Sequence, residues 1–167
     1  LVDNGSGEAV KKKIEEMTAD APDILYIYEP MEFNFSKMCN LGAERAEGSL
    51  LLFLNDDIEA THTGWLSDMA KLAERPHVGA VGCKLLYPDT DKIQHAGITN
   101  LPMGPVHKLQ FLRDNKCYYD NRNRGIRNVS AVTAACLMVR REVFEEAGGF
   151  CESMQVCLLY TSPSPRD

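Results

Sequence analysis

The feature that most constrains the fold is an apolar run that ends in two acids. Residues 49–54 read Ser-Leu-Leu-Leu-Phe-Leu, and Asn55, Asp56 and Asp57 follow directly. A continuous apolar run of this length, preceded by Gly48, predicts a β-strand that is covered on both faces. Ligands of open α/β sheets bind beyond the carboxyl ends of the strands, and hard oxygen ligands there suit a divalent cation that carries phosphates. The same three residues also suit a solvated turn that closes a strand.

Length and composition are those of one globular domain. The chain has 167 residues, of which 44% are hydrophobic and 25% are charged, enough for a sizeable core. A net charge of -6 and a pI near 5.2 argue against a general nucleic-acid binder. No apolar run approaches membrane-spanning length. The six cysteines are scattered without a C-x-x-C pair, so we expect reduced thiols in a cytosolic protein rather than a zinc site or a disulfide framework.

Strand and helix signals alternate through the first half of the chain. They predict strands at 1–3, 24–28, 49–54 and 78–81, and helices at 7–18, at 34 or 36 to 46, and from 63 to near 76. The expected helix N-caps are Ser6, Asn34 or Ser36, and Thr63. This order predicts an α/β fold whose parallel sheet is connected by crossover helices.

The second half of the chain has weaker signals. Residues 84–87 and 93–98 are predicted to be extended, 129–139 are apolar and β-rich, and 141–147 are predicted to be a short helix. Residues 100–127 are polar without a clear period, which is typical of a long functional loop.

Residues 157–167 do not continue the preceding pattern. They read Cys-Leu-Leu-Tyr-Thr-Ser-Pro-Ser-Pro-Arg-Asp, which resembles the translation of a transposase-type sequencing adapter. We therefore expect a domain at 1–156 and a non-native tail at 157–167. A native Ser/Pro-rich tail is the alternative.

A series of short motifs resembles the family-2 glycosyltransferases of the GT-A fold. In chain order the motifs lie at 2–6, 33–36 with Asn40 and Gly42, 52–57, 78–82 with 84–88, 94–97, 132–141 and 148–150. The nearest subgroup is the rhamnosyltransferase-like bacterial enzymes of cell-surface polysaccharide synthesis. The resemblance implies a Rossmann-like three-layer α/β sandwich with a mostly parallel sheet, here incomplete.

The resemblance also implies a reaction and roles for individual residues. The reaction is an inverting, metal-assisted transfer of a sugar from a nucleotide-diphosphate sugar to a glycan or lipid-linked acceptor. The D-x-D signature of the family falls on residues 55–57. Asp57 would bind Mn²⁺ or Mg²⁺, while Asn55 and Asp56 would help to bind the donor. Asn55 stands in the place of the first Asp, which weakens the argument for a bidentate metal site.

Three further residues are candidates for substrate binding. Asp3 matches the acid that contacts the nucleoside of the donor, although an Asp before Asn-Gly also forms turns. His95 and Thr133 are candidate sugar or acceptor contacts, and a structural role for His95 is equally in view. Five basic residues suit either a phosphorylated lipid carrier, the donor diphosphate, or a solvated loop: Arg113, Lys116, Arg122, Arg124 and Arg127.

Two elements of the family pattern are expected outside this sequence. A first strand would precede Leu1, and the catalytic base would follow Val156. Cys151 also stands where the family usually has Asp. We therefore expect the longer protein to be the enzyme and residues 1–156 alone to be inactive.

Two other functions remain open at this point. One is a sugar-nucleotide pyrophosphorylase, and the other is a non-catalytic sugar-nucleotide-binding paralogue. We expect a cytoplasmic protein without a nucleic-acid partner, which the longer chain could bring to the inner face of the membrane as a peripheral protein.

Overall fold

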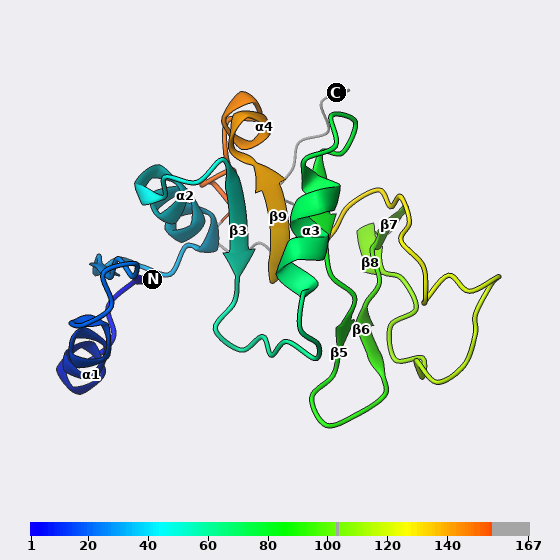
Figure 1. Cartoon of the computed structure of the whole chain (residues 1–167), viewed down its shortest axis with the longest axis horizontal. Helices are drawn as coiled ribbons and strands as arrows, with labels where there is room; N and C mark the ends of the chain where they lie inside the picture. The colour runs from blue at the N-terminus through cyan, green and yellow to red at the C-terminus, as the bar shows by residue number, and fades with distance from the viewer. Residues whose placement is uncertain (103, 155–167) are drawn as a thin grey trace. The chain divides into compact units, whose positions relative to one another are not determined.

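The computed structural model describes residues 1–102 and 104–154. The expected tail at 157–167 and the expected base beyond Val156 lie outside the described residues. The chain divides into two compact units, one of Leu1–Gly48 with Glu145–Asp167 and one of Ser49–Phe144. The elements in chain order are β1 (Val2–Asp3), α1 (Glu8–Thr18), β2 (Ile27–Tyr28), α2 (Phe35–Arg45), β3 (Leu50–Leu54), α3 (Trp65–Ala73), β4 (Ala80–Gly82), β5 (Leu85–Leu86), β6 (Ile93–His95), β7 (Ile98–Leu101), β8 (Gly104–His107), β9 (Cys136–Arg140) and α4 (Arg141–Glu146) (Figure 1).

The first unit contains a short parallel pair and two helices. β1 and β2 pair in parallel, with Asp3 opposite Tyr28. The side chain of Asn34 caps α2 by accepting a hydrogen bond from the Lys37 amide at 2.9 Å, so one of the two predicted caps is confirmed. The predicted cap at Ser6 is wrong. The Ser6 amide instead donates to the Asp3 carboxylate at 2.8 Å, and the N-cap of α1 is Gly7.

The second unit is built around a three-stranded sheet in the order β3-β9-β4. β9 is antiparallel to both neighbours, so that Met138 lies opposite Leu52 on one side and Val81 on the other. The prediction of a mostly parallel sheet is therefore wrong, because β1·β2 is the one parallel pairing among the described strands. β3 and β4 do run in the same direction, as a crossover through α3 requires. β9, far away in the sequence, lies between them.

One face of β3 is buried and the other is only half-buried, with Leu54 46% exposed, so the prediction of a strand covered on both faces is confirmed for one face alone. On one face, Met69 and Ala73 of α3 form a buried cluster with Cys136 and Met138 of β9, and Figure 1 shows α3 beside β9. Leu51 and Phe53 of β3 are also buried, and they point to the opposite face because side chains alternate along a strand. The Phe144 ring lies 5.1 Å from the Phe53 ring between centroids.

The N-terminus of α3 differs from its prediction. The N-cap of α3 is Gly64, with φ of 85° and no side-chain cap, rather than Thr63. The left-handed region that Gly64 occupies is accessible to glycine at little cost, so the chain turns into the helix one residue later than predicted.

The predicted loop at 100–127 begins with a strand. β7 and β8 form an antiparallel hairpin in which Asn100 lies opposite Pro105. Pro105 and Gly104 are typical of loops, but β8 pairs with β7 alone among the described strands, and proline is tolerated at such an edge. None of the helices in the described residues is long and apolar enough to cross a bilayer.

Arg140 holds the carboxyl end of α3, and we expect its loss to destabilise the second unit. Its guanidinium donates to the carbonyls of Ala73 at 2.7 Å, Arg75 at 2.9 Å and Val78 at 3.0 Å. Arg140→Gln should lower the free energy of unfolding by about 2 kcal/mol, because three carbonyls, two of them in part-buried hydrogen bonds, lose a charged donor. Urea unfolding measures the difference. Arg75→Gln removes an exposed side chain of the same type and should change stability by less than about 0.5 kcal/mol; equal losses in the two variants would contradict this role of Arg140.

Candidate functional site

The two acids after β3 lie on a tight turn. The Asn55 amide donates to the Ala135 carbonyl at 2.9 Å, which extends the pairing of β3 with β9 by one residue. The Ile58 amide donates back to the Asn55 carbonyl at 3.3 Å, so Asp56 and Asp57 occupy the two central positions of a four-residue turn. Both acids are exposed, so a ligand in solution can reach them.

Asp56 and Asp57 are the two carboxylates that this turn offers to a cation, and a metal bound by them stays a prediction. No group of three or more His, Cys, Asp and Glu side chains that could hold a metal ion occurs in residues 1–102 and 104–154. Mg²⁺ in phosphate-transfer sites is commonly bound through one or two carboxylates, with water and substrate phosphates completing the shell. Asp57 and Asp56 can supply those one or two carboxylates.

Three of the predicted site residues in the second unit are linked by hydrogen bonds. The Thr133 amide donates to Nε2 of His95 at 3.4 Å, and the Thr133 hydroxyl oxygen accepts from the Ala135 amide at 3.3 Å. Ala135 in turn accepts from Asn55. The structure therefore brings His95, Thr133 and Asn55 together, although the sequence placed them on three separate motifs.

The contacts of His95 define its tautomer. Its Nε2 accepts from the amides of Gly97 at 3.2 Å and Thr133 at 3.4 Å, so this nitrogen carries a lone pair. The proton is therefore on Nδ1, which lies 2.7 Å from Nδ1 of His107 and donates to it. The side chain is only 1% exposed, and burial, helped by His107, lowers the pKa of His95 to about 4. These contacts give His95 a structural role, and its contact with a sugar stays a prediction.

The buried neutral His95 gives the stability of the protein a pH dependence. Its folded pKa of about 4 lies below the usual 6.5, so the unfolded state binds the proton more tightly. The contribution of His95 is complete above pH 6.5 and is lost as the pH falls from there towards about 4; the full loss is about 3 kcal/mol. Urea unfolding across this range should show a steeper pH slope for the wild type than for His95→Asn. The matched variant of an exposed histidine, His62→Asn, should keep the wild-type slope, and three equal slopes would exclude His95 as the cause.

Asp3 forms a turn in the first unit. Its Oδ1 accepts from the amides of Gly5 at 3.0 Å and Ser6 at 2.8 Å, and its Oδ2 accepts from the Tyr26 hydroxyl at 2.7 Å. Burial alone would raise the pKa of Asp3, but the hydrogen bonds from Tyr26, Ser6 and Gly5 outweigh burial and lower the pKa to about 2. The turn-forming interpretation of Asp3 accounts for these contacts. A contact with the nucleoside stays a prediction, and it would use the remaining lone pair of Oδ2.

Tyr26 is a partner of Asp3 that the sequence did not indicate. Burial and the hydrogen bond to Asp3 raise the pKa of Tyr26 to about 12, so the hydroxyl remains a donor. Tyr26 lies just before β2 and pairs with an acid that is 23 positions away. No local pattern signals such a pair.

Side chains of the 33–42 motif hold the segment after α4. The amide of Asn40 pairs with both backbone groups of Phe150, each at 2.9 Å. Asn34 donates to the Glu152 carbonyl at 2.8 Å, and Ser36 donates to the Met154 carbonyl at 3.2 Å. The motifs at 33–42 and 148–150, which are far apart in the sequence, thus contact each other in the first unit.

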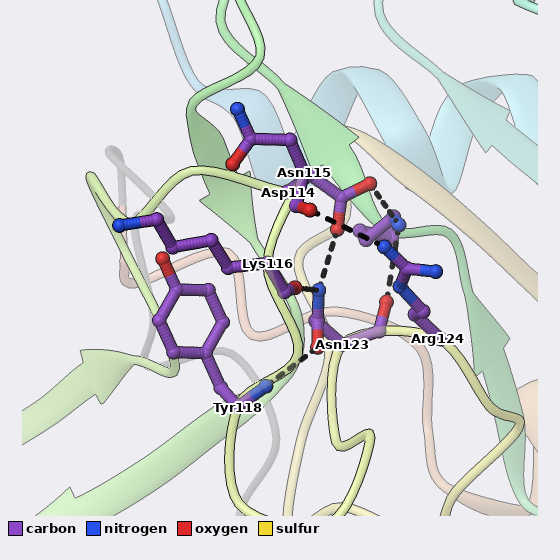
Figure 2. A network of polar contacts seen from close by, with 7 residues as sticks. Asp114, Asn115, Lys116, Tyr118, Asn123 and Arg124 are labelled. Carbon is purple, nitrogen blue, oxygen red and sulfur yellow. Dashed lines mark hydrogen bonds and ion pairs between the residues drawn. The ribbon is translucent and has the colours of Figure 1, made fainter.

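A buried asparagine organises the basic loop of the second unit. Figure 2 shows that the Asn123 amide nitrogen donates to the Asp114 carboxylate at 3.0 Å and to the Lys116 carbonyl at 2.8 Å. Its oxygen accepts from the Tyr118 amide at 3.2 Å. Lys84 adds an ion pair with Asp114 at 2.6 Å. The network orders the loop, but the five basic side chains singled out in the sequence are all exposed, so the solvated-loop alternative stands beside the anion-binding one.

Comparison with known proteins identifies the class and then the family. The fold is similar to that of a solved structure, the mannosyltransferase PcManGT from Pyrobaculum calidifontis in complex with GDP-Man and Mn²⁺, with a TM-score of 0.58 at 17% identity over 90% of this chain and 37% of that one. This likeness defines a GT-A glycosyltransferase fold. A family model described as glycosyl transferase family 2 matches residues 1–148. The chain belongs to glycosyltransferase family 2.

Two curated relatives are much longer than this chain. The O-antigen biosynthesis protein RfbC of Myxococcus xanthus is 38% identical over 169 residues, which cover 94% of this chain and 12% of that protein. The uncharacterized protein y4gI of Sinorhizobium fredii is 38% identical over 156 residues, which cover 92% of this chain and 17% of that protein. The chain therefore spans less than a fifth of the length of either relative.

Proposed function

We propose that this chain is the donor-binding part of an enzyme that transfers a sugar from a nucleotide-diphosphate sugar to a glycan or lipid-linked acceptor. The observation that carries the proposal is the exposed pair Asp56 and Asp57, held on a tight turn beside residues 133–135 in a chain of glycosyltransferase family 2. The O-antigen biosynthesis relative supports a role in bacterial cell-surface polysaccharide. A rhamnosyltransferase-like specificity and a cytoplasmic site of action belong to the same proposal.

The chemistry requires negative charge to be neutralised as the diphosphate leaves. Asp57, helped by Asp56, would hold Mn²⁺ or Mg²⁺, and a bound ion would act as a Lewis acid on the diphosphate oxygens. Asn55 keeps the turn in register with Ala135, and this contact fixes where the two carboxylates lie. Asp3 would accept a hydrogen bond from the nucleoside. An inverting reaction also needs a base, which we place beyond Val156.

Donor binding tests the proposal without requiring turnover. The 167-residue chain is titrated calorimetrically with UDP-, GDP- and dTDP-sugars, with Mn²⁺ or with EDTA. We expect one nucleotide series to bind, with an affinity that the metal increases at least about tenfold, since the ion bridges the carboxylates and the phosphates. Absence of binding in all three series, or binding that EDTA leaves unchanged, would contradict the proposed site. Donor binding by a longer protein that transfers no sugar would favour the non-catalytic paralogue.

A further inference from the structure

The second unit contains a pocket with a basic lining. Its volume is about 580 Å³, and its lining includes Lys108, Tyr119, Arg122, Arg127 and Asn128. This volume lies within the range of small-molecule sites in proteins. The pocket contains three cationic side chains and no Asp or Glu in its lining.

The charge of the pocket stands out against the acidic chain. Residues 108–127 hold six of the 18 Lys and Arg but only two of the 24 Asp and Glu. Within the described residues, the side chains of Lys108 and Arg122 have no hydrogen-bond or ion-pair partner. Unpaired cations that line a concave surface attract an anion, and arginine in particular matches the geometry of phosphate oxygens.

The pocket is built from strained and tethered backbone. Tyr119, Asp120 and Asn121 have positive φ angles of 45°, 58° and 63°, a conformation that costs roughly 1–2 kcal/mol for each non-glycine residue. The Arg127 guanidinium donates to the Asp120 carbonyl at 3.0 Å, which ties the strained turn to the pocket. Backbone strain of this kind concentrates at functional sites.

Two further features indicate what the anion carries. Tyr119 is 71% exposed, and an exposed aromatic side chain beside polar groups suits the apolar face of a sugar ring. The lining also includes Ala96 and Thr99, which flank the Gly97 that hydrogen-bonds to His95. The pocket thus lies next to the His95 contact, while our proposal gives the donor diphosphate to Asp56 and Asp57.

We propose that this pocket binds the sugar-phosphate group of a phosphorylated glycan acceptor. Arg122, Arg127 and Lys108 contact the phosphate, and Tyr119 contacts the sugar. This inference rests on the proposed function, which assigns the donor to the turn after β3 and so leaves the pocket for the acceptor.

Binding of a simple sugar phosphate tests the pocket. The 167-residue chain is titrated with glucose 1-phosphate, inorganic phosphate and the neutral methyl glucoside. We expect glucose 1-phosphate to bind more tightly than both others. The double variant Arg122→Gln/Arg127→Gln should weaken binding at least about tenfold, since it removes two charged donors. Arg113→Gln/Lys116→Gln removes the same charge from the same loop outside the pocket lining and should leave the affinity within about twofold, because screened surface charges contribute little.

Several outcomes would overturn the proposal. They are equal binding of methyl glucoside, an unchanged affinity of the pocket variant, or an equal loss in the matched control. Lys108→Gln serves if the double variant fails to fold, because the Lys108 side chain has no described partner, and it should weaken binding about tenfold. Full competition by the nucleoside diphosphate that binds at the donor site would assign the pocket to the donor and refute the acceptor role. If the chain binds glucose 1-phosphate but none of the nucleotide sugars, the proposed function fails while the pocket proposal stands.

Discussion

We expect Asp57→Ala to abolish the metal-dependent part of donor binding. Asp57 sits exposed at the corner of the turn after β3, where its carboxylate is available to a cation carried by the donor phosphates. Lewis-acid assistance of this kind contributes several kcal/mol, and about 1.4 kcal/mol corresponds to tenfold in rate. Turnover of the longer enzyme should therefore fall by roughly two orders of magnitude or more. Calorimetry with Mn²⁺ and with EDTA measures the binding part.

Three variants distinguish the metal ligand from its neighbours. Asp56→Ala should be milder, because the proposal makes Asp57 the metal ligand and Asp56 its helper. Asp3→Ala should weaken donor binding and leave its metal dependence intact. Since Asp3 also holds the amides of Gly5 and Ser6, a thermal melt must accompany that measurement. Asp23→Ala removes an exposed acid outside the site and should change nothing. Metal-dependent, near-normal turnover of Asp57→Ala would show that the cation site lies elsewhere.

The sequence is sufficient to predict β3 and the start of α2, because neighbouring residues determine both. β3 follows from its apolar run, because a short apolar run bounded by turn signals indicates a strand. The start of α2 follows from Asn34, because a side-chain oxygen at that position satisfies an otherwise unpaired amide. These features depend on residues within a few positions of each other.

Strand pairing could not be predicted in the same way. β3 reads as a parallel strand because it is apolar throughout, yet its partner β9 is antiparallel and more than 80 positions away. An apolar run reports burial and not the direction of the neighbour. The helix starts at Gly7 and Gly64 also escaped prediction, because backbone conformation rather than a side-chain oxygen determines them.

The sequence indicates which residues belong to the candidate site but not how they contact one another. Asn55, Thr133 and His95 belong to separate motifs, and hydrogen bonds donated by backbone amides join them in the structure. The tautomer of His95 depends on Gly97 and His107, and no motif reveals it. Lys108 is not among the basic residues that the sequence indicates. It joins Arg122 and Arg127 in one pocket lining only through the fold of the β7–β8 hairpin, which it follows.

Gly97 is a position where both the backbone conformation and a close neighbour oppose substitution. Its φ of 97° is rarely adopted by other residues, and an added Cβ would lie 2.5 Å from Cγ1 of Val129. Its amide donates to His95 at 3.2 Å, and its carbonyl accepts from the Lys108 amide at 2.8 Å. Because Val129 also lines the basic pocket, a shift of either residue would disturb both the histidine pair and the pocket.

We expect Gly97→Ala to lower the free energy of unfolding by about 2–5 kcal/mol, as the sum of left-handed strain and overpacking against Val129. Urea unfolding measures the loss. Gly79→Ala is the matched control, since a Cβ there meets no atom within 4 Å, and it should change stability by less than about 1 kcal/mol. Adding Val129→Ala to Gly97→Ala removes the contact at 2.5 Å but leaves Cβ of residue 129 at 2.9 Å. It should therefore recover part of the overpacking and none of the strain, and the double-mutant cycle should give a coupling of about 1–2 kcal/mol. If Gly97→Ala were as stable as Gly79→Ala, the close approach of Val129 to Gly97 could not be part of the folded state.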